Sequence, residues 1–319
     1  RNRHDFHAVC IAAGRVETPG LVGTALPPLT DKEAAALVRL YVSREMENRL
    51  TGKLSGYKLL SDGPLLESVV QHGSGIPLLL EWLCKVAALA PDALDPALLP
   101  QEEAERLRYA IDRYIRRLRE EATTTNDAAL WESYYLMVYG AVPRRIPGAG
   151  LLRALLTDLE GTPFTARTNY DALFEQLGRE SFSTTAGEGA RVYHELVRDG
   201  VLHALAREDS GRLRELHARA EAWYKTNGDK VERLYHALHA NYDGAVSALF
   251  QEIENALAGK AWAEAQELIA LADDAALTES DRERLLLSKA DLAWGEQNPA
   301  RALERLRGLY VSHEQGIRA

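Results

Sequence analysis

Two residues of the sequence stand where they could contact an anionic ligand. Arg15 follows the apolar run His7–Ala13, which is typical of a buried strand in a parallel sheet. Open α/β sheets bind their ligands beyond the carboxyl ends of such strands. His194 follows a β-like stretch and opens a helical one, and its imidazole can donate a hydrogen bond to a phosphate oxygen. The alternatives are a solvated loop arginine and a satisfied histidine at a domain junction.

A third candidate is the turn Gly75-Ile76-Pro77, which leads directly into the apolar residues 78–80. Glycine permits backbone angles that other residues avoid, and proline loses nothing at the first position of a helix, where its N–H would be unpaired. On these grounds alone the stretch is a well-started helix. A ligand contact at this turn is implied only by the family resemblance given below.

The elements that must position these residues are mainly helical. Thr30 and Glu33 form a capping box that starts a helix, and residues 101–122 have the clearest helical period of apolar residues. We therefore expect a helical domain over residues 25–124. The polar run 123–126 is expected to break the chain before the next helix.

The spacing of apolar residues changes from helical to alternating within the next unit. Three predicted helices, over 129–139, 151–159 and 169–177, are followed by alternating residues at 181–185 and a returning stretch at 190–193. Such an alternation around a glycine-containing turn predicts a β-hairpin. Three helices followed by a hairpin predict a winged helix.

From His194 onward the pattern is helical, with breaks that cut the chain into helices of ordinary length. The segments 258–265 and 293–302 resemble each other after a shift of roughly 36 residues, close to the tetratricopeptide period of about 34. We expect a tetratricopeptide-like array, and the alternative is a plain helical bundle.

Length, charge and cysteine content limit the classes of function that are expected. The 319 residues predict two to four domains, and the net charge of −9 argues against non-specific nucleic-acid binding over the whole chain. Cys10 and Cys84 lack metal-ligand spacing and are expected to be buried thiols in a reducing cytoplasm. No apolar run reaches the length of a membrane span. The start at Arg1, without an initiator methionine, predicts a fragment of a longer protein.

No complete catalytic or metal motif is present in the sequence. Neither Gly52-Lys53 nor Gly259-Lys260 belongs to a phosphate-binding loop, and the nucleophile and zinc-protease motifs are absent. His236 and His239 have a spacing that could bind a metal, but no third ligand accompanies them, so they and His217 are interpreted mainly as packing and capping residues. We predict no catalytic residue and no metal ligand.

The stretch 193–199, Tyr-His-Glu-Leu-Val-Arg-Asp, resembles the Phe-His-x-Leu-Val-Arg-Asp form of bacterial signal-transduction NTPases with numerous domains (STAND), the superfamily of the NB-ARC and NACHT switches. Arg15, the Gly75-Ile76-Pro77 turn and His194 occur in the order of that family's nucleotide contacts. The resemblance implies an arginine sensor, a turn at the adenine and a histidine at the phosphates. Tyr193 replaces the methionine of the family's "MHD-like" motif, and Glu195 replaces its aspartate.

The resemblance implies four domains. They are the end of a nucleotide-binding α/β domain (1–24), a helical lid (25–124), a winged helix (125–199) and a tetratricopeptide-like sensor (200–319). It also implies a cytoplasmic ATP/ADP switch, held closed by ADP, with Mg²⁺ bound by residues outside this chain. A protein or peptide ligand on the tail would open it, cause homo-oligomerisation and activate an N-terminal effector, such as a protease, nuclease or NADase in antiviral defence.

Two alternatives come from other classes of protein. The first is a maltose-regulator-like transcription regulator with the same switch, although the predicted recognition helix, 169–177, carries Asp171 and Glu175 and no basic residue. The second is a helical scaffold that binds no nucleotide. Co-purifying nucleotide would distinguish a switch from a scaffold.

Overall fold

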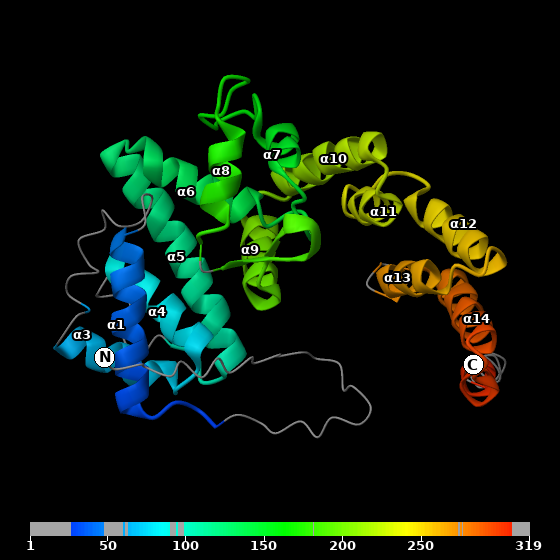
Figure 1. Ribbon diagram of the computed structural model, residues 1–319, viewed down its shortest axis with the longest axis horizontal. Helices are drawn as coiled ribbons and strands as arrows, with labels where there is room; N and C mark the ends of the chain where they lie inside the picture. The colour runs from blue at the N-terminus through cyan, green and yellow to red at the C-terminus, as the bar shows by residue number, and fades with distance from the viewer. Residues whose placement is uncertain are drawn as a thin grey trace, which may run out of the picture.

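The computed structural model describes residues 27–47, 60, 63–89, 94, 99–180, 182–273, 275 and 277–307. Within these residues the fold is mainly α-helical, as predicted, with one sheet of two strands (Figure 1). The predicted strand 7–13, Cys10 and Arg15 lie outside the described residues. Among the described helices, none combines the length and the apolar character that a membrane span requires.

The first group of helices corresponds to the predicted lid. It comprises α1 (Asp31–Glu47), α3 (Pro64–Gly73), α4 (Pro77–Leu89) and α5 (Glu103–Thr125). The predicted capping box is confirmed, because Thr30 N–H donates to Glu33 Oε2 over 2.9 Å and Glu33 N–H donates to Thr30 Oγ1 over 3.4 Å. Helix α4 is buried on nearly all sides, including Cys84, and packs against α5.

The end of α5 differs from the prediction. The hydroxyls of Thr123, Thr124 and Thr125 each donate to the carbonyl four residues earlier, so this polar run stays helical. The helix ends at Asn126, which adopts the left-handed conformation at a φ of 52°. Asp127 then caps the next helix by accepting a hydrogen bond from Ala129 N–H over 2.8 Å.

The next unit is three helices followed by a hairpin. The elements are α6 (Ala128–Tyr139), α7 (Ala149–Leu156), α8 (Tyr170–Leu177), β1 (Ser183–Thr185), the 3₁₀ turn η2 (Gly187–Gly189) and β2 (Arg191–Tyr193). The strands are antiparallel, with Ser183 opposite Tyr193 and Thr185 opposite Arg191. The predicted hairpin is therefore confirmed in type and place.

The rest of the chain consists of consecutive helices. They are α9 (Glu195–Glu208), α10 (Ser210–Asn227), α11 (Lys230–His239), α12 (Ala245–Ala258), α13 (Trp262–Asp273) and α14 (Glu279–Gly295), and residues 299–307 are also helical. Figure 1 shows α12–α14 extending away from the body formed by α1 to α9, with α10 and α11 between them.

Two hydrophobic cores hold these helices together. The first core extends without interruption from Ala34 to Tyr224. It includes helices α1 and α3–α5 as well as the elements α6 to β2, called here the hairpin unit. The second extends from Leu234 to Leu292. Helices α10 and α11 pack against each other across the seam between the two cores. The seam contains the buried polar side chains His217, Glu232 and His236. This contact between α10 and α11 is called the α10–α11 joint.

Candidate functional site

The Gly75-Ile76-Pro77 turn forms the tight connection between α3 and α4. Gly75 is buried, with a φ of +70°, and its carbonyl accepts a hydrogen bond from Leu29 N–H over 3.0 Å. A Cβ at Gly75 would lie 2.4 Å from Leu29 O, so only glycine fits beside the 27–30 segment. Pro77 is the first residue of α4, as predicted, and remains exposed, whereas Ile76 is half-buried.

The same turn is fixed to α5 by an arginine. Arg106 donates to His72 O over 2.8 Å and to Ser74 Oγ over 2.9 Å. Helix α9 contacts α5 further along, where an added Cβ at Gly200 would lie 2.8 Å from Ile111 Cδ1. The two attachment points, Arg106 and Ile111, are about 7.5 Å apart along the axis of α5, given the rise of about 1.5 Å per residue.

His194 occupies the N-cap position of α9. Its backbone N–H donates to Phe182 O over 2.9 Å, and its carbonyl accepts from Arg198 N–H over 2.9 Å. Its side chain is exposed and, among the described residues, makes no hydrogen bond or ion pair. The preceding Tyr193 is buried, and its O–H donates to Leu136 O over 2.5 Å. Tyr193 therefore anchors the hairpin to α6, while His194 is available to a ligand.

The structure brings the predicted site residues together only in part. Both the turn and the helix that follows His194 are attached to α5, but no hydrogen bond or ion pair between described residues joins His194 to Gly75, Ile76 or Pro77. Arg15 lies outside the described residues, so its predicted contact with the same ligand stays a prediction.

The α10–α11 joint is centred on two buried histidines. His217 on α10 and His236 on α11 have exposed fractions of 1% and 0%, and their Nδ1 atoms are 2.9 Å apart. Such a hydrogen bond requires that one Nδ1 carries a proton and the other does not. Burial lowers the pKa of His217 to about 3 and lowers the pKa of His236 well below its ordinary value. Both rings are therefore neutral at neutral pH.

Aromatic rings surround the histidine pair. The His217 ring stacks on that of His239, with centroids 4.9 Å apart, and the His236 ring stacks on that of Tyr224 at 5.5 Å. Tyr235 packs edge-on against both buried histidines. The Nε2 atom of His236 has no hydrogen-bond partner among the described residues. The pair is thus isolated from water by apolar ring faces.

Arg198 connects the joint to the hairpin unit. It lies on α9, four residues after His194, and donates to Val142 O over 2.9 Å, to Pro143 O over 3.3 Å and to Tyr235 Oη over 2.6 Å. One side chain therefore ties α9 both to the segment between α6 and α7 and to α11. Hydrogen bonds from a charged donor are stronger than neutral ones, so Arg198 is a main fastening of this junction.

Ion pairs from the segment between α6 and α7 complete the joint. Arg144 contacts Glu232 at 3.0 Å, and Arg145 contacts Asp229 at 2.6 Å. Glu232 is 6% exposed, and burial raises its pKa although the Arg144 guanidinium acts against this. These carboxylates lie at the start of α11 and hold it against the hairpin unit.

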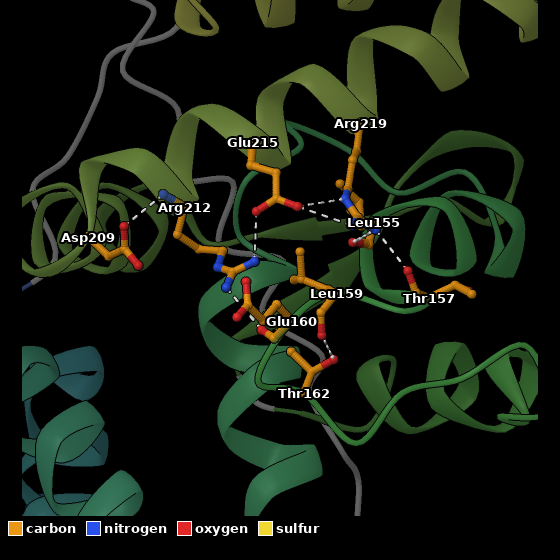
Figure 2. A network of polar contacts seen from close by, with 9 residues as sticks. All are labelled: Leu155, Thr157, Leu159, Glu160, Thr162, Asp209, Arg212, Glu215 and Arg219. Carbon is orange, nitrogen blue, oxygen red and sulfur yellow. Dashed lines mark hydrogen bonds and ion pairs between the residues drawn. The ribbon is translucent and has the colours of Figure 1, made fainter.

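A second polar network fixes α10 to the end of α7 (Figure 2). Arg219 donates to Thr157 O over 2.8 Å, and Arg212 donates to Glu160 O over 2.9 Å. Glu215 lies between them and accepts from both arginines, at 2.7 Å and 3.1 Å. Helix α10 is therefore held firmly to the hairpin unit, and α11 is the first helix that belongs to the second core.

The sequence indicated these histidines but not their contact. The interpretation of His217, His236 and His239 as packing residues agrees with their rings lying against each other. Among the residues that the structure describes, no group of three histidine, cysteine or carboxylate side chains could hold a metal ion. The role of Arg198 was missed. The recurrence of histidine and tyrosine at helical spacing on two successive helices was the available signal.

Comparison with known proteins adds no relative. No protein-family model, no curated protein and no solved structure matches this chain.

Replacing Gly75 by alanine is expected to lower the free energy of unfolding by about 2–4 kcal/mol. The left-handed backbone costs a residue with a Cβ roughly 1–2 kcal/mol, and the contact with Leu29 adds overpacking. Gly228→Ala is the matched control, because Gly228 also has a positive φ but nothing lies within 4 Å of an added Cβ. Urea unfolding at constant m-value measures both. Equal losses in the two variants would contradict the assigned contact.

Arg198→Met is expected to lower the free energy of unfolding by about 2–4 kcal/mol, because it removes a charged donor from three acceptors while keeping an apolar stem of similar length. The control is Arg214→Met, on an exposed residue that bonds only within its own helix. That change is expected to stay within about 0.5 kcal/mol. A loss for Arg198→Met no larger than for the control would show that Arg198 does not fasten the joint.

Proposed function

We propose that this chain is the regulatory part of a nucleotide-dependent signalling switch of the STAND type. In this proposal residues 1–24 end a nucleotide-binding domain, 25–124 form a lid, 125–199 form a winged helix and 200–319 form a tetratricopeptide-like sensor. The observation that carries the proposal is His194, an exposed, unbonded imidazole at the N-cap of α9, directly after the hairpin.

The position of His194 suits an anion. The N-terminus of a helix carries partial positive charge and free N–H groups, and an adjacent imidazole donor adds to the attraction for a phosphate. Its preceding neighbour Tyr193 is fixed to α6, so the direction of the backbone at His194 is set by the hairpin unit. A histidine held in this way would report the charge of a nucleotide to the winged helix.

The turn suits an adenine in part. The Gly75 carbonyl is used by Leu29, so the surface offered to a base is the exposed Pro77 ring and the half-buried Ile76. Bound ADP would supply the phosphate charge that the switch reads. The residues of this chain would bind the base at the turn and the phosphates at Arg15 and His194, and Mg²⁺ would be held elsewhere.

A recurring turn between the C-terminal helices supports the proposal of a repeat-like sensor. Lys260 and Gln297 both adopt left-handed backbone, with φ of 56° and 60°, directly after α12 and α14. In each turn the N–H of the left-handed residue donates to the carbonyl three residues earlier, and the next N–H donates to the carbonyl five residues earlier. Asn241, after α11, adopts the same turn, so the turn recurs after 19 and then 37 residues, close to one half and one whole tetratricopeptide period.

Switching requires only that tail ligand and nucleotide prefer different arrangements of the domains. In the closed state ADP would join the lid to the winged helix, and a protein or peptide on the tail would favour an open state that oligomerises and activates an N-terminal effector. Direct DNA binding through the hairpin unit is disfavoured, because α8 exposes Asp171 and Glu175 and carries no basic side chain.

The nucleotide carried by the complete protein tests this proposal. The protein is purified, denatured, and its released small molecules are separated by anion exchange. We expect ADP from the wild type and from His203→Ala, whose histidine is also exposed on α9, but less ADP, or ATP in its place, from His194→Ala. A well-folded wild type that releases no adenine nucleotide would exclude the ADP-closed switch and favour a regulator or scaffold.

A further inference from the structure

The α10–α11 joint places two titratable side chains at a seam between two hydrophobic cores. His217 belongs to the helix that is fastened to the hairpin unit, and His236 belongs to the helix that begins the second core. Their hydrogen bond therefore crosses from one body of the protein to the other. Separation of α11 from α10 would break this bond and expose both rings to water.

The charges around the pair disfavour an additional proton. Arg198 faces it from α9, and Arg144 faces it from the segment between α6 and α7. Glu232, on α11, contacts Arg144 through Oε1, and its Oε2 has no hydrogen-bond partner among the described residues. The remaining neighbours are His239 and Tyr235 of α11 and Tyr224 of α10. No carboxylate among the described residues is hydrogen-bonded to either histidine, so a positive charge on the pair would have no hydrogen-bonded counter-ion.

We propose that the α10–α11 joint is a proton-sensitive latch, closed while His217 and His236 are both neutral and opened by proton uptake, which releases α11 and the second core from the hairpin unit. The latch is a property of the joint itself and does not depend on a nucleotide. If the switch proposed above is correct, Arg198 gives the latch a direct route to α9, the helix that begins after His194.

The sign of the pH dependence follows from the two states. In the closed joint burial keeps the pKa of both histidines below the ordinary value of about 6.5, and opening restores that value. Above pH 6.5 neither state binds the protons. Below it the open state takes them up, and each histidine favours opening by up to about tenfold per pH unit. For two histidines together, the ratio of open to closed protein rises by at most roughly 100-fold per pH unit.

Glu232 acts in the opposite direction over a narrower range. Because burial raises its pKa, the closed joint holds a proton on Glu232 that the open joint would release, between the ordinary pKa of 4.5 and the raised value. This reduces the net uptake by at most one proton. Between pH 7.5 and 5.5 we therefore expect the open fraction to rise by about 10- to 100-fold.

Helix α11 has 10 residues, too short to keep its backbone hydrogen bonds once it separates from α10, so hydrogen exchange of its amides reports the opening. Backbone exchange of α11 in the complete protein is followed between pH 7.5 and 5.5, each rate being divided by the intrinsic chemical rate at that pH. Protection in the wild type is expected to fall by about 10- to 100-fold over this range, while α13, inside the second core, keeps its protection.

The test variant is His217→Asn combined with His236→Asn, which keeps an amide donor and acceptor near the Nδ1 positions but cannot titrate. Its protection is expected to be lower overall and no longer to fall towards pH 5.5, because Glu232, the titrating group that remains, acts in the opposite direction. His203→Gln, on an exposed histidine of α9, should follow the wild type. If the double variant does not fold, His217→Asn alone carries the test, with a dependence reduced by about tenfold.

Two outcomes would overturn the latch. One is wild-type protection in α11 that does not change between pH 7.5 and 5.5. The other is a folded variant without His217 and His236 that retains the full pH dependence, because the titrating groups would then lie elsewhere. Neither outcome depends on whether the protein carries a nucleotide, so the latch and the nucleotide switch are tested separately.

Discussion

A hydrogen bond between two buried imidazoles lies where the two hydrophobic cores of this protein meet. The Nδ1 atoms of His217 and His236 are 2.9 Å apart, and both side chains are almost fully buried. Two neutral rings satisfy this geometry, whereas two charged rings cannot, because each nitrogen would then be a donor. A buried polar pair thus occupies a helix contact that leucine side chains could also fill. Apolar packing would be less costly, so the pair is better explained as a switchable contact than as a source of stability.

Other polar contacts also cross the boundary between the two cores. Arg198 reaches across it from α9 to Tyr235, and the salt bridges of Arg144 and Arg145 hold the start of α11. The N-terminal turn of α9 thus has two tasks. Its N-cap residue, His194, is exposed to solvent, and Arg198, four residues later, contacts the joint. Movement of α11 relative to α10 would disturb Arg198 before it disturbed the core of the hairpin unit, which gives the tail a physical connection to the proposed nucleotide contact.

Local signals in the sequence predicted local structure well. Thr30 with Glu33 predicted the start of α1, Pro77 predicted the start of α4, and the alternation before His194 predicted the hairpin. The predicted end of α5 was wrong, because the threonine hydroxyls of the polar run donate to carbonyls of the helix and the run therefore stays helical. The joint was not predicted, since the His217–His236 contact joins residues 19 apart on two helices and the Arg198–Tyr235 contact joins residues 37 apart. Such contacts depend on helix packing, which no spacing in one helix reveals. The domain division and the nucleotide contacts stay predictions.

Measuring the protonation state of His217 and His236 tests the proposed latch most directly. Nitrogen-15 spectra of the imidazole rings, assigned through the His217→Asn and His236→Asn variants, distinguish the two neutral tautomers from the charged ring. At pH 6 we expect two neutral rings, one protonated at Nδ1 and the other at Nε2. A charged ring at either position of the closed joint would contradict it, because the seam would then hold a cation that its surroundings do not compensate.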